Sequence, residues 1–427
     1  MNLKDTFCSS PWISMRITNQ GNLVFCRGAG STTQTEYNIS NTDIVDYFQN
    51  HMSEFRQKLL LGQTINQCHR CHQMDTHGKV SLRKKQLAKV GVVPQHFEKT
   101  LLSSPFADEF EYSLHSKGHT TLLPVDWQID LGNYCNSACI FCTPYDSSKL
   151  AKELYDLGFI KQQPVKSWTS DTALVDKFIQ VLESTPTLEY LHFIGGEPLI
   201  NPAFKRILDR LHTIGKTESI VGFTTNLTVY NDDLISTLTK FRNVHIGVSI
   251  ETLHTVNDYI RYPIDTRQAK IQLDRWIQTA RQHNWSLQIR TTPTLFSINF
   301  LDELYEYAYQ NNVVIEACNF IEEPAFMRPS VLPESYRLEA AQKLQKWINQ
   351  YNNDSNSDVL NARDSKQVRS YLLQDAQSYV HYLKNESDET HRLPDLINYI
   401  KGLESNRNNV ILDYLPEYEN FLRSAGY

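Results

Sequence analysis

The chain alternates predicted strands with predicted helices from Val125 to Asn319, and this rhythm limits the fold more than any other feature of its sequence. Each predicted strand is rich in β-branched or aromatic residues, and most of them end in polar or turn-prone residues. A strand and a helix repeated along a chain favour a parallel sheet with helices outside it. The six predicted strands span residues 125–131, 188–194, 220–225, 245–250, 287–292 and 313–320.

Helical periodicity fills the intervals between these strands, at residues 172–183, 203–213, 232–240, 267–283 and 300–310. Six strand-helix units are fewer than the eight of a closed barrel. We therefore predict an α/β fold, a partial (β/α)6 barrel of the TIM type, over residues 121–330.

The regions on either side of this segment have a different character. Residues 1–120 lack the strand-helix rhythm and hold four cysteines, which predicts a separate N-terminal metal-binding module built on those four thiols. Residues 331–427 show apolar residues at helical spacing, no cysteine and no strand pattern, which predicts a helical C-terminal cap. A polar loop is expected at residues 352–358 of this cap.

Composition narrows the class of protein. Of the 427 residues, 41% are hydrophobic and 21% are charged, as in ordinary globular proteins. The net charge of -6 argues against a nucleic-acid partner, because phosphate binding normally needs a surplus of Lys and Arg. The chain shows neither a signal peptide nor an apolar run of membrane-spanning length, so we expect a cytoplasmic protein with no membrane partner. Thiols are kept reduced there, and clustered cysteines more often bind metal than pair in disulfides.

Three of the cysteines form a tight group directly after the first predicted strand. Cys135, Cys139 and Cys142 follow a CxxxCxxC pattern in the sequence IDLGNYCNSACIFCTPY. Three thiolates from one short loop can bind three irons of a cubane cluster and leave the fourth iron open to a small molecule. A zinc site or buried thiols are the alternatives, although zinc usually wants a fourth protein ligand that is missing nearby in the sequence.

A second motif ends the second predicted strand, in the sequence LHFIGGEPLINP. Gly195 and Gly196 let backbone approach a ligand closely, and Glu197, followed by Pro198, can receive an ammonium group. The alternative is an ordinary turn.

Together these motifs resemble the radical S-adenosylmethionine (SAM) superfamily. The resemblance includes the aromatic Phe141 directly before the third cysteine, and it implies a 4Fe-4S cluster on Cys135, Cys139 and Cys142, which are then also the catalytic residues. It further implies that the backbone at Phe141 meets the SAM adenine and that the GGEP segment, Gly195, Gly196, Glu197 and Pro198, contacts the methionyl amino group.

Weaker matches follow in the order expected of this family. TTNL at residues 224–227 is similar to the third-strand segment and contains Asn226, and IGVSIE at residues 246–251 is similar to the fourth-strand segment and contains Ser249. Arg261 stands where relatives have an arginine that reaches the SAM carboxylate, a bidentate role that suits a guanidinium. Each of these three residues could instead be an ordinary cap, turn or surface residue.

The four N-terminal cysteines are Cys8, Cys26, Cys68 and Cys71. GNLVFC at residues 21–26, followed by CHRC, resembles the twitch or SPASM modules that hold auxiliary 4Fe-4S clusters in radical SAM enzymes, but here the module precedes the barrel. A structural zinc or free thiols are the alternatives, and neighbouring histidines are alternative ligands. Cys318, at the end of the sixth predicted strand, is expected to be a packed small residue, with a role toward substrate left open.

The resemblance implies an enzyme of the oxidoreductase or peptide-modifying type. SAM would be cleaved reductively to methionine and a 5'-deoxyadenosyl radical that removes hydrogen from a substrate. Twitch and SPASM relatives often modify peptides or protein side chains, so we expect such a substrate and an electron donor such as flavodoxin or ferredoxin. The alternatives are a modifier of a nucleoside or small molecule, an activating enzyme, and a cluster-bearing sensor that is no enzyme.

Overall fold

A computed structural model describes residues 3–28, 35–76, 80–163, 166–316, 321, 323–352 and 363–427. Cys318 and nearly all of the loop predicted at residues 352–358 lie outside the described residues.

The strands follow the order β2-β1-β3-β4-β5-β6-β7-β8 in one sheet. Within the described residues β2 and β8 lie at the two ends of this order, so the sheet is open. The pairs β1–β3, β3–β4, β6–β7 and β7–β8 are parallel, and the pair β1–β2 is antiparallel. The predicted α/β class and open, partial barrel are confirmed. The strands are β1 (Ser14–Ile17), β2 (Leu23–Val24), β3 (Asp126–Asp130), β4 (Tyr190–Ile194), β5 (Ile220–Thr225), β6 (Asn243–Ser249), β7 (Ser286–Arg290) and β8 (Val314–Glu316).

Strands β1 and β2 are the elements that the sequence pattern missed. β1 has only four residues and β2 has only two, too few to show a strand pattern. It nevertheless pairs in parallel with β3, from Ser14 opposite Asp126 to Ile17 opposite Ile129. The N-terminal segment therefore contributes strands to the sheet.

The α-helices match the predicted ranges within one or two residues where a helix was expected between strands. Up to β4 they are α1 (Leu3–Thr6), α2 (Ser10–Ile13), α3 (Ile44–Asp46), α4 (Ser53–Leu60), α5 (His69–Thr76), α6 (Leu82–Lys89), α7 (Phe97–Leu102), α8 (Ala107–His115), α9 (Ser148–Asp156) and α10 (Thr172–Ser184). After β4 they are α11 (Pro202–Thr213), α12 (Asp232–Leu238), α13 (Val256–Ile260), α14 (Thr266–His283), α15 (Leu301–Gln310), α16 (Glu334–Asn352), α17 (Arg363–Asn385), α18 (Leu393–Arg407) and α19 (Glu419–Ser424).

The chain divides into two compact units that do not follow the sequence order. The first unit comprises Met1–Tyr134, Val165–Gly222 and Asp232–Val244, and the second comprises Cys135–Pro164, Phe223–Asn231 and His245–Tyr427. The division into residues 1–120, 121–330 and 331–427 remains a prediction.

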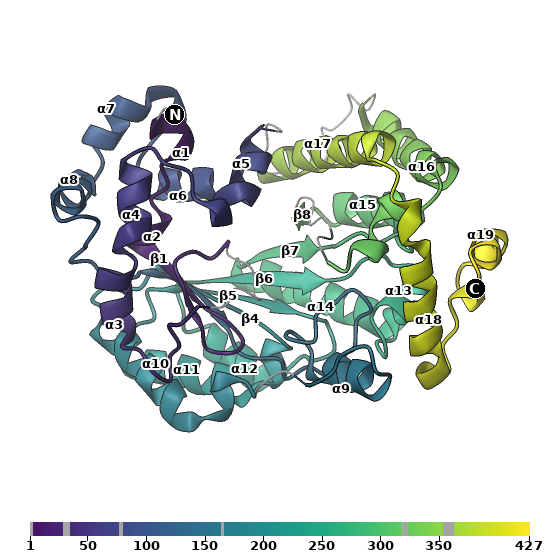
Figure 1. Cartoon of the computed structure of the whole chain (residues 1–427), viewed down its shortest axis with the longest axis horizontal. Coiled ribbons are helices and arrows are strands. Elements are labelled where there is room, and N and C mark those ends of the chain that lie inside the picture. The colour runs from purple at the N-terminus through teal and green to yellow at the C-terminus, as the bar shows by residue number, and fades with distance from the viewer. Residues whose placement is uncertain are drawn as a thin grey trace. The chain divides into compact units, whose positions relative to one another are not determined.

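In the first unit, helices α10 and α11 lie side by side and pack on the sheet (Figure 1). Asp171 caps α10 by accepting from the Ala173 amide, and Asn201 caps α11 in the same way, so both helices begin where the sequence offers a short polar side chain. Phe178 of α10 is fully buried against Trp127 of β3, with ring centroids 5.2 Å apart in an edge-to-face arrangement. Burying such a side chain contributes about 2–3 kcal/mol, so packing on the sheet fixes these helices.

The other face of β3 is polar. Asp126 is fully buried and accepts from Arg27 Nη1 at 2.9 Å, from Gln86 Nε2 at 3.0 Å and from Lys89 Nζ. A buried carboxylate is tolerated only when it is paired and hydrogen-bonded. The N-terminal segment, which supplies these donors, therefore completes the first unit.

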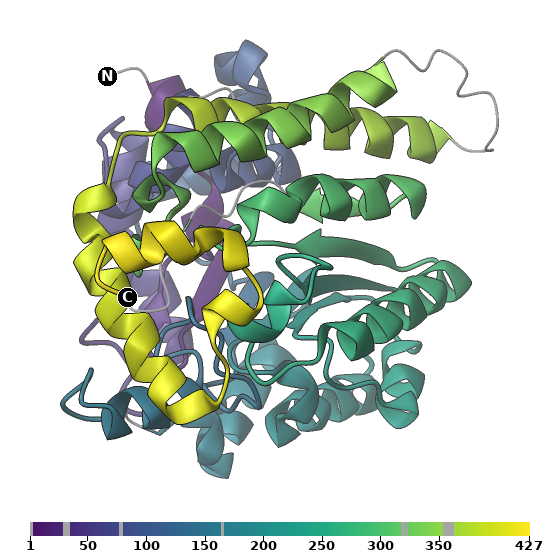
Figure 2. The ribbon, with the colours of Figure 1, turned by 90° about the vertical axis from the view of Figure 1, so that its right-hand side faces the viewer.

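In the second unit, α16 and α17 run alongside each other (Figure 2). Tyr305 of α15 donates to Asp375 of α17 at 2.6 Å, and Trp347 Nε1 of α16 donates to Glu306 of α15 at 2.7 Å. These contacts join the last strand-helix unit to the predicted helical C-terminal region, which is confirmed. No helix in the described ranges has both the length and the apolar character needed to cross a bilayer.

Candidate functional site

The three-cysteine loop lies in the second unit, and its backbone pairs with the end of α13 and the residues just after it. The Ala138 amide donates to the Tyr262 carbonyl at 2.7 Å, and the Ile140 amide donates to the Ile260 carbonyl at 2.9 Å. The two chain segments therefore run antiparallel, which places Cys139 directly across from Arg261. Two residues that are remote in the sequence thereby become neighbours.

Arg261 is buried beside the Cys139 thiol. Its guanidinium pairs with Glu251 through two nitrogens, with Nη2 at 2.9 Å from Oε1, and its Nη1 lies 3.7 Å from Cys139 Sγ. It also lies over the Phe141 ring, 5.6 Å from the centroid. Burial lowers the pKa of Arg261, but the charges of Glu251 and Cys139 outweigh burial and raise it above its ordinary value. A permanent cation therefore stands next to a predicted cluster ligand.

Asn226 lies beside the first cysteine. Its Nδ2 is 3.9 Å from Cys135 Sγ and donates to Asn136 Oδ1 at 2.8 Å. Ser137 Oγ lies between two of the thiols, 3.3 Å from Cys135 Sγ and 3.7 Å from Cys139 Sγ. The structure thus brings Asn226 to the cysteine loop.

The surroundings of Cys142 disfavour its ionisation. Burial, the Asp146 carboxylate and the Cys139 and Cys135 thiolates all raise its pKa well above the ordinary value. A sulfur must be deprotonated to bind metal. With a raised pKa, this thiol becomes a thiolate only when a cation or metal lies next to it. Three soft sulfur donors on one loop fit an iron-sulfur cluster.

The GGEP segment belongs to the first unit. Gly195 and Gly196 have φ values of +86° and +53°, and a Cβ on Gly196 would lie 2.2 Å from the Tyr134 carbonyl oxygen. The Glu197 amide donates to that same carbonyl at 3.0 Å. This turn therefore requires glycine on steric grounds alone.

Glu197 is buried, and its Oε1 accepts from the Leu199 amide at 3.1 Å at the start of the 3-10 helix η5 (Pro198–Ile200). Ser249 ends β6, opposite Arg290 of β7. The contacts of Phe141, the GGEP residues, Asn226, Ser249 and Arg261 with SAM remain predictions.

The four N-terminal cysteines come from separate segments of the first unit: the loop after α1, the loop after β2, the 3-10 helix η2 (Asn66–Cys68) and α5. The pKa of Cys8 is raised well above its ordinary value by burial and by the charges of Cys26, Cys68 and Cys71, so the four thiols lie within electrostatic range of one another. Burial, Cys26 and Cys71 likewise raise the pKa of Cys68 to about 12. The fold therefore brings these four cysteines into the same part of the first unit.

The backbone around this group is held in place. The Gly28 amide and Ser10 Oγ lie 3.2 and 3.5 Å from Cys26 Sγ. Arg56 is fully buried, and its Nε donates to the Pro11 carbonyl at 2.9 Å, which ties the segment after Cys8 to α4. Burial lowers the pKa of Arg56 to about 9, so the guanidinium is still charged at neutral pH.

Two facts bear on the ligands. His69 is exposed and its ring bonds to the Asn66 carbonyl at 3.1 Å, which leaves the thiols as the better donors of this group. Across the part of the chain that the structure describes, no three His, Cys, Asp or Glu side chains are arranged to hold a single metal ion, and none of the seven described cysteines forms a disulfide.

Several residues that surround the three-cysteine loop were not predicted from the sequence. Glu251 is fully buried and stands two residues after Ser249, within the quoted segment, so an unusual acidic residue at a strand end was the available signal. Tyr399 and Arg407 of α18 also contact the loop. No local signal marks them, because their role depends on where the C-terminal helix packs.

One protein-family model matches part of the chain. Residues 129–285 match the family model described as the Radical SAM superfamily. The match runs from the end of β3 to the residue before β7 and includes all three cysteines of the loop. This segment is thus similar to a family whose members use a 4Fe-4S cluster and SAM.

Particular relatives are more distant. No curated protein matches the chain. The solved structure "Native anSMEcpe with bound AdoMet" is 14% identical, with a TM-score of 0.39 over 54% of this chain and 62% of that chain. The structure of Streptococcus suis SuiB bound to precursor peptide SuiA is 17% identical, with a TM-score of 0.37 over 82% of this chain and 69% of that chain. The chain therefore spans less than two thirds of the first of these.

Proposed function

We propose that this chain is a radical SAM enzyme that removes a hydrogen atom from a peptide or protein substrate. The observation that carries the enzyme class is the three-cysteine loop within the matched domain, with Cys139 across from the buried Arg261. A 4Fe-4S cluster held by Cys135, Cys139 and Cys142 would supply the electron that cleaves SAM to methionine and a 5'-deoxyadenosyl radical. The peptide class rests on the resemblance of the N-terminal cysteines to twitch and SPASM modules.

The residues around the loop have defined tasks in this proposal. Arg261 supplies a fixed positive charge beside the cluster, and Glu251 fixes its orientation through two contacts. Asn226 holds the backbone near Cys135 through Asn136. An electron donor such as flavodoxin or ferredoxin, an auxiliary 4Fe-4S cluster or zinc on the N-terminal cysteines, and a cytoplasmic location belong to the same proposal.

An anaerobic assay tests the function. With dithionite and SAM, the reconstituted protein should form 5'-deoxyadenosine, and a peptide library deuterated at its carbon positions should transfer deuterium into that product. Mass spectrometry of 5'-deoxyadenosine reads both results. Deuterium from a nucleoside or small molecule, with none from peptides, would replace the substrate class, and a protein that holds a cluster yet never cleaves SAM would be a sensor.

A substitution tests the role of the buried cation. Arg261→Lys keeps a charge but loses the guanidinium, which contacts Glu251 through two nitrogens and is expected to reach the SAM carboxylate. We expect SAM binding to weaken by about 1–3 kcal/mol, the usual value for a charge-assisted hydrogen bond. This equals about a 5- to 150-fold rise in Kd, measured by equilibrium dialysis under anaerobic conditions. The control is Arg281→Lys on the exposed surface of α14. Equal SAM affinity in both variants would remove Arg261 from the binding site.

A further inference from the structure

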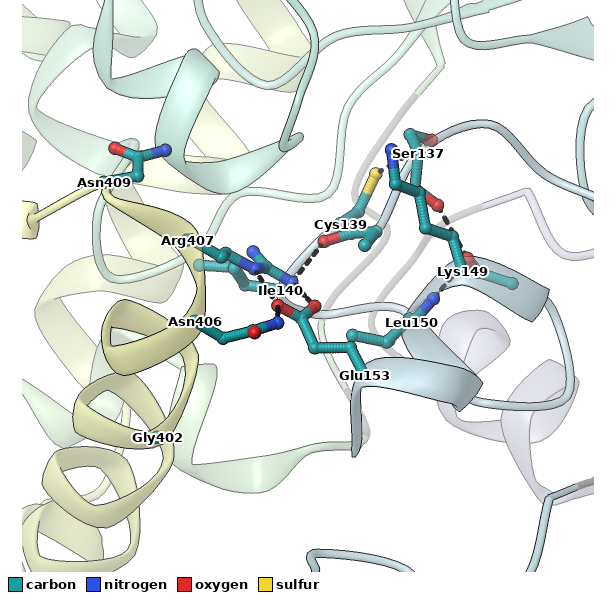
Figure 3. A network of polar contacts seen from close by, with 12 residues as sticks. Ser137, Cys139, Ile140, Lys149, Leu150, Glu153, Gly402, Asn406, Arg407 and Asn409 are labelled. Carbon is teal, nitrogen blue, oxygen red and sulfur yellow. Dashed lines mark hydrogen bonds and ion pairs between the residues drawn. The ribbon is translucent and has the colours of Figure 1, made fainter. Parts of the chain in front are cut away.

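Helix α18 contacts the cysteine loop on both sides of Cys139. Tyr399 Oη donates to the Ile140 carbonyl at 3.0 Å, and Arg407 Nη2 donates to the Ala138 carbonyl at 2.9 Å. Figure 3 shows Arg407 reaching from α18 to the loop beside Cys139. The two carbonyl groups that flank one predicted cluster ligand thus both accept from the same C-terminal helix.

The amides of these flanking residues are also occupied. As described above, the Ala138 and Ile140 amides donate to the carbonyls on either side of Arg261. Both residues next to Cys139 are therefore hydrogen-bonded through their N–H and their C=O groups. Because the backbone on each side is fixed, the direction in which the Cys139 side chain leaves the loop is fixed as well.

The same helix also contacts the segment that carries Arg261. The Arg407 guanidinium lies 4.8 Å from the centroid of the Tyr262 ring, and Glu404 Oε1 accepts from Tyr259 Oη at 3.0 Å. α18 therefore contacts both the loop that carries Cys139 and the segment that carries Arg261.

Arg407 makes these contacts from a buried position. It pairs with Glu153 of α9, with Nε at 2.8 Å from Oε1, and both side chains are more than nine-tenths buried (Figure 3). Apolar residues of similar size could anchor a helix equally well, because a buried ion pair rarely adds net stability. What the ion pair and the Tyr399 hydroxyl add is directed bonding to two chosen carbonyl groups.

We infer that Tyr399 and Arg407 are positioning residues that hold the cysteine loop in its cluster-binding geometry. The inference rests on the proposed cluster at Cys135, Cys139 and Cys142, and it gives the C-terminal helix a role in the reaction site. Groups that orient metal ligands typically change metal affinity or activity by 10–100-fold when they are lost, so these residues should control how firmly iron is held.

The test compares two tyrosines that differ in what they hold. Tyr399→Phe removes a buried hydroxyl that donates to Ile140, whereas the control Tyr418→Phe removes a buried hydroxyl that donates to the Leu295 carbonyl at 2.9 Å. The two losses should lower the melting temperature similarly. A second variant, Arg407→Lys, keeps the charge toward Glu153 but loses the fork that also reaches Ala138.

The readout is the release of iron from anaerobically reconstituted full-length protein to a chelator. The phase that is missing in a Cys135, Cys139 and Cys142→Ala variant reports the loop cluster. In Tyr399→Phe this phase should be about 10-fold faster than in wild type, with a smaller increase in Arg407→Lys and none in Tyr418→Phe. The change that SAM induces in the EPR spectrum of the reduced cluster should be altered in the same order.

Two outcomes would overturn the inference, and they can be told apart. If Tyr399→Phe and Tyr418→Phe release iron at rates within two-fold of wild type, α18 merely packs on the loop, while the proposed function stands. If wild type itself lacks this iron-release phase, the loop holds no cluster and the proposed function fails together with the inference.

Discussion

Replacing Cys135, Cys139 and Cys142 together by Ala should abolish the formation of 5'-deoxyadenosine from SAM under strong reductant. The reason is that these three thiols are the iron ligands expected of the matched domain, and they lie together on one loop. Their loss should remove about four irons per chain, the content of one cubane cluster. The chain should keep its fold, because each change to alanine removes a single heavy atom, the sulfur.

Iron and zinc analysis of the same samples completes this test. Wild type should hold about eight irons if both cysteine groups bind clusters, or about four irons and one zinc if the N-terminal group binds zinc. The N-terminal metal should persist in the triple variant. If wild type binds only trace metal after reconstitution, or if the triple variant still cleaves SAM, the assignment of the loop is wrong.

Replacing Cys68 and Cys71 by Ser should separate SAM cleavage from modification of the substrate. The expected SAM contacts all come from the matched domain and the residues near it, whereas these two cysteines precede the first strand of that domain. We therefore expect slow formation of 5'-deoxyadenosine with dithionite to continue and deuterium transfer from the peptide substrate to be lost.

This variant needs a check on folding, because a structural metal can supply much of the folding free energy of a small region. Circular dichroism and the iron content of the loop cluster provide it. Cys26→Ser is a useful companion, since Cys26 belongs to the same group but comes from a different segment. A well-folded variant that modifies substrate at the wild-type rate would show that the N-terminal group is a structural staple.

The sequence by itself determined the class of fold, and it predicted which loop would hold the cluster. The strand-helix rhythm predicted the strands and helices of this segment correctly, because the 2-residue period of strands and the 3.6-residue period of helices are local properties of the chain. The spacing of Cys135, Cys139 and Cys142 is equally local, since three ligands on one short loop need no knowledge of the rest of the fold. The glycines of the GGEP turn belong to this group too, because only glycine suits their backbone angles.

Tertiary structure alone decided the contacts between distant segments. The placement of β1 beside β3 depends on hydrogen bonds between residues more than a hundred positions apart. A strand of four residues is too short for its hydrophobic pattern to predict this pairing. The opposition of Cys139 and Arg261 depends on a backbone pairing that neither segment shows alone. The contacts of Tyr399 and Arg407 with the loop depend on the packing of α18, and helical periodicity identifies the buried face of a helix without saying what that face meets.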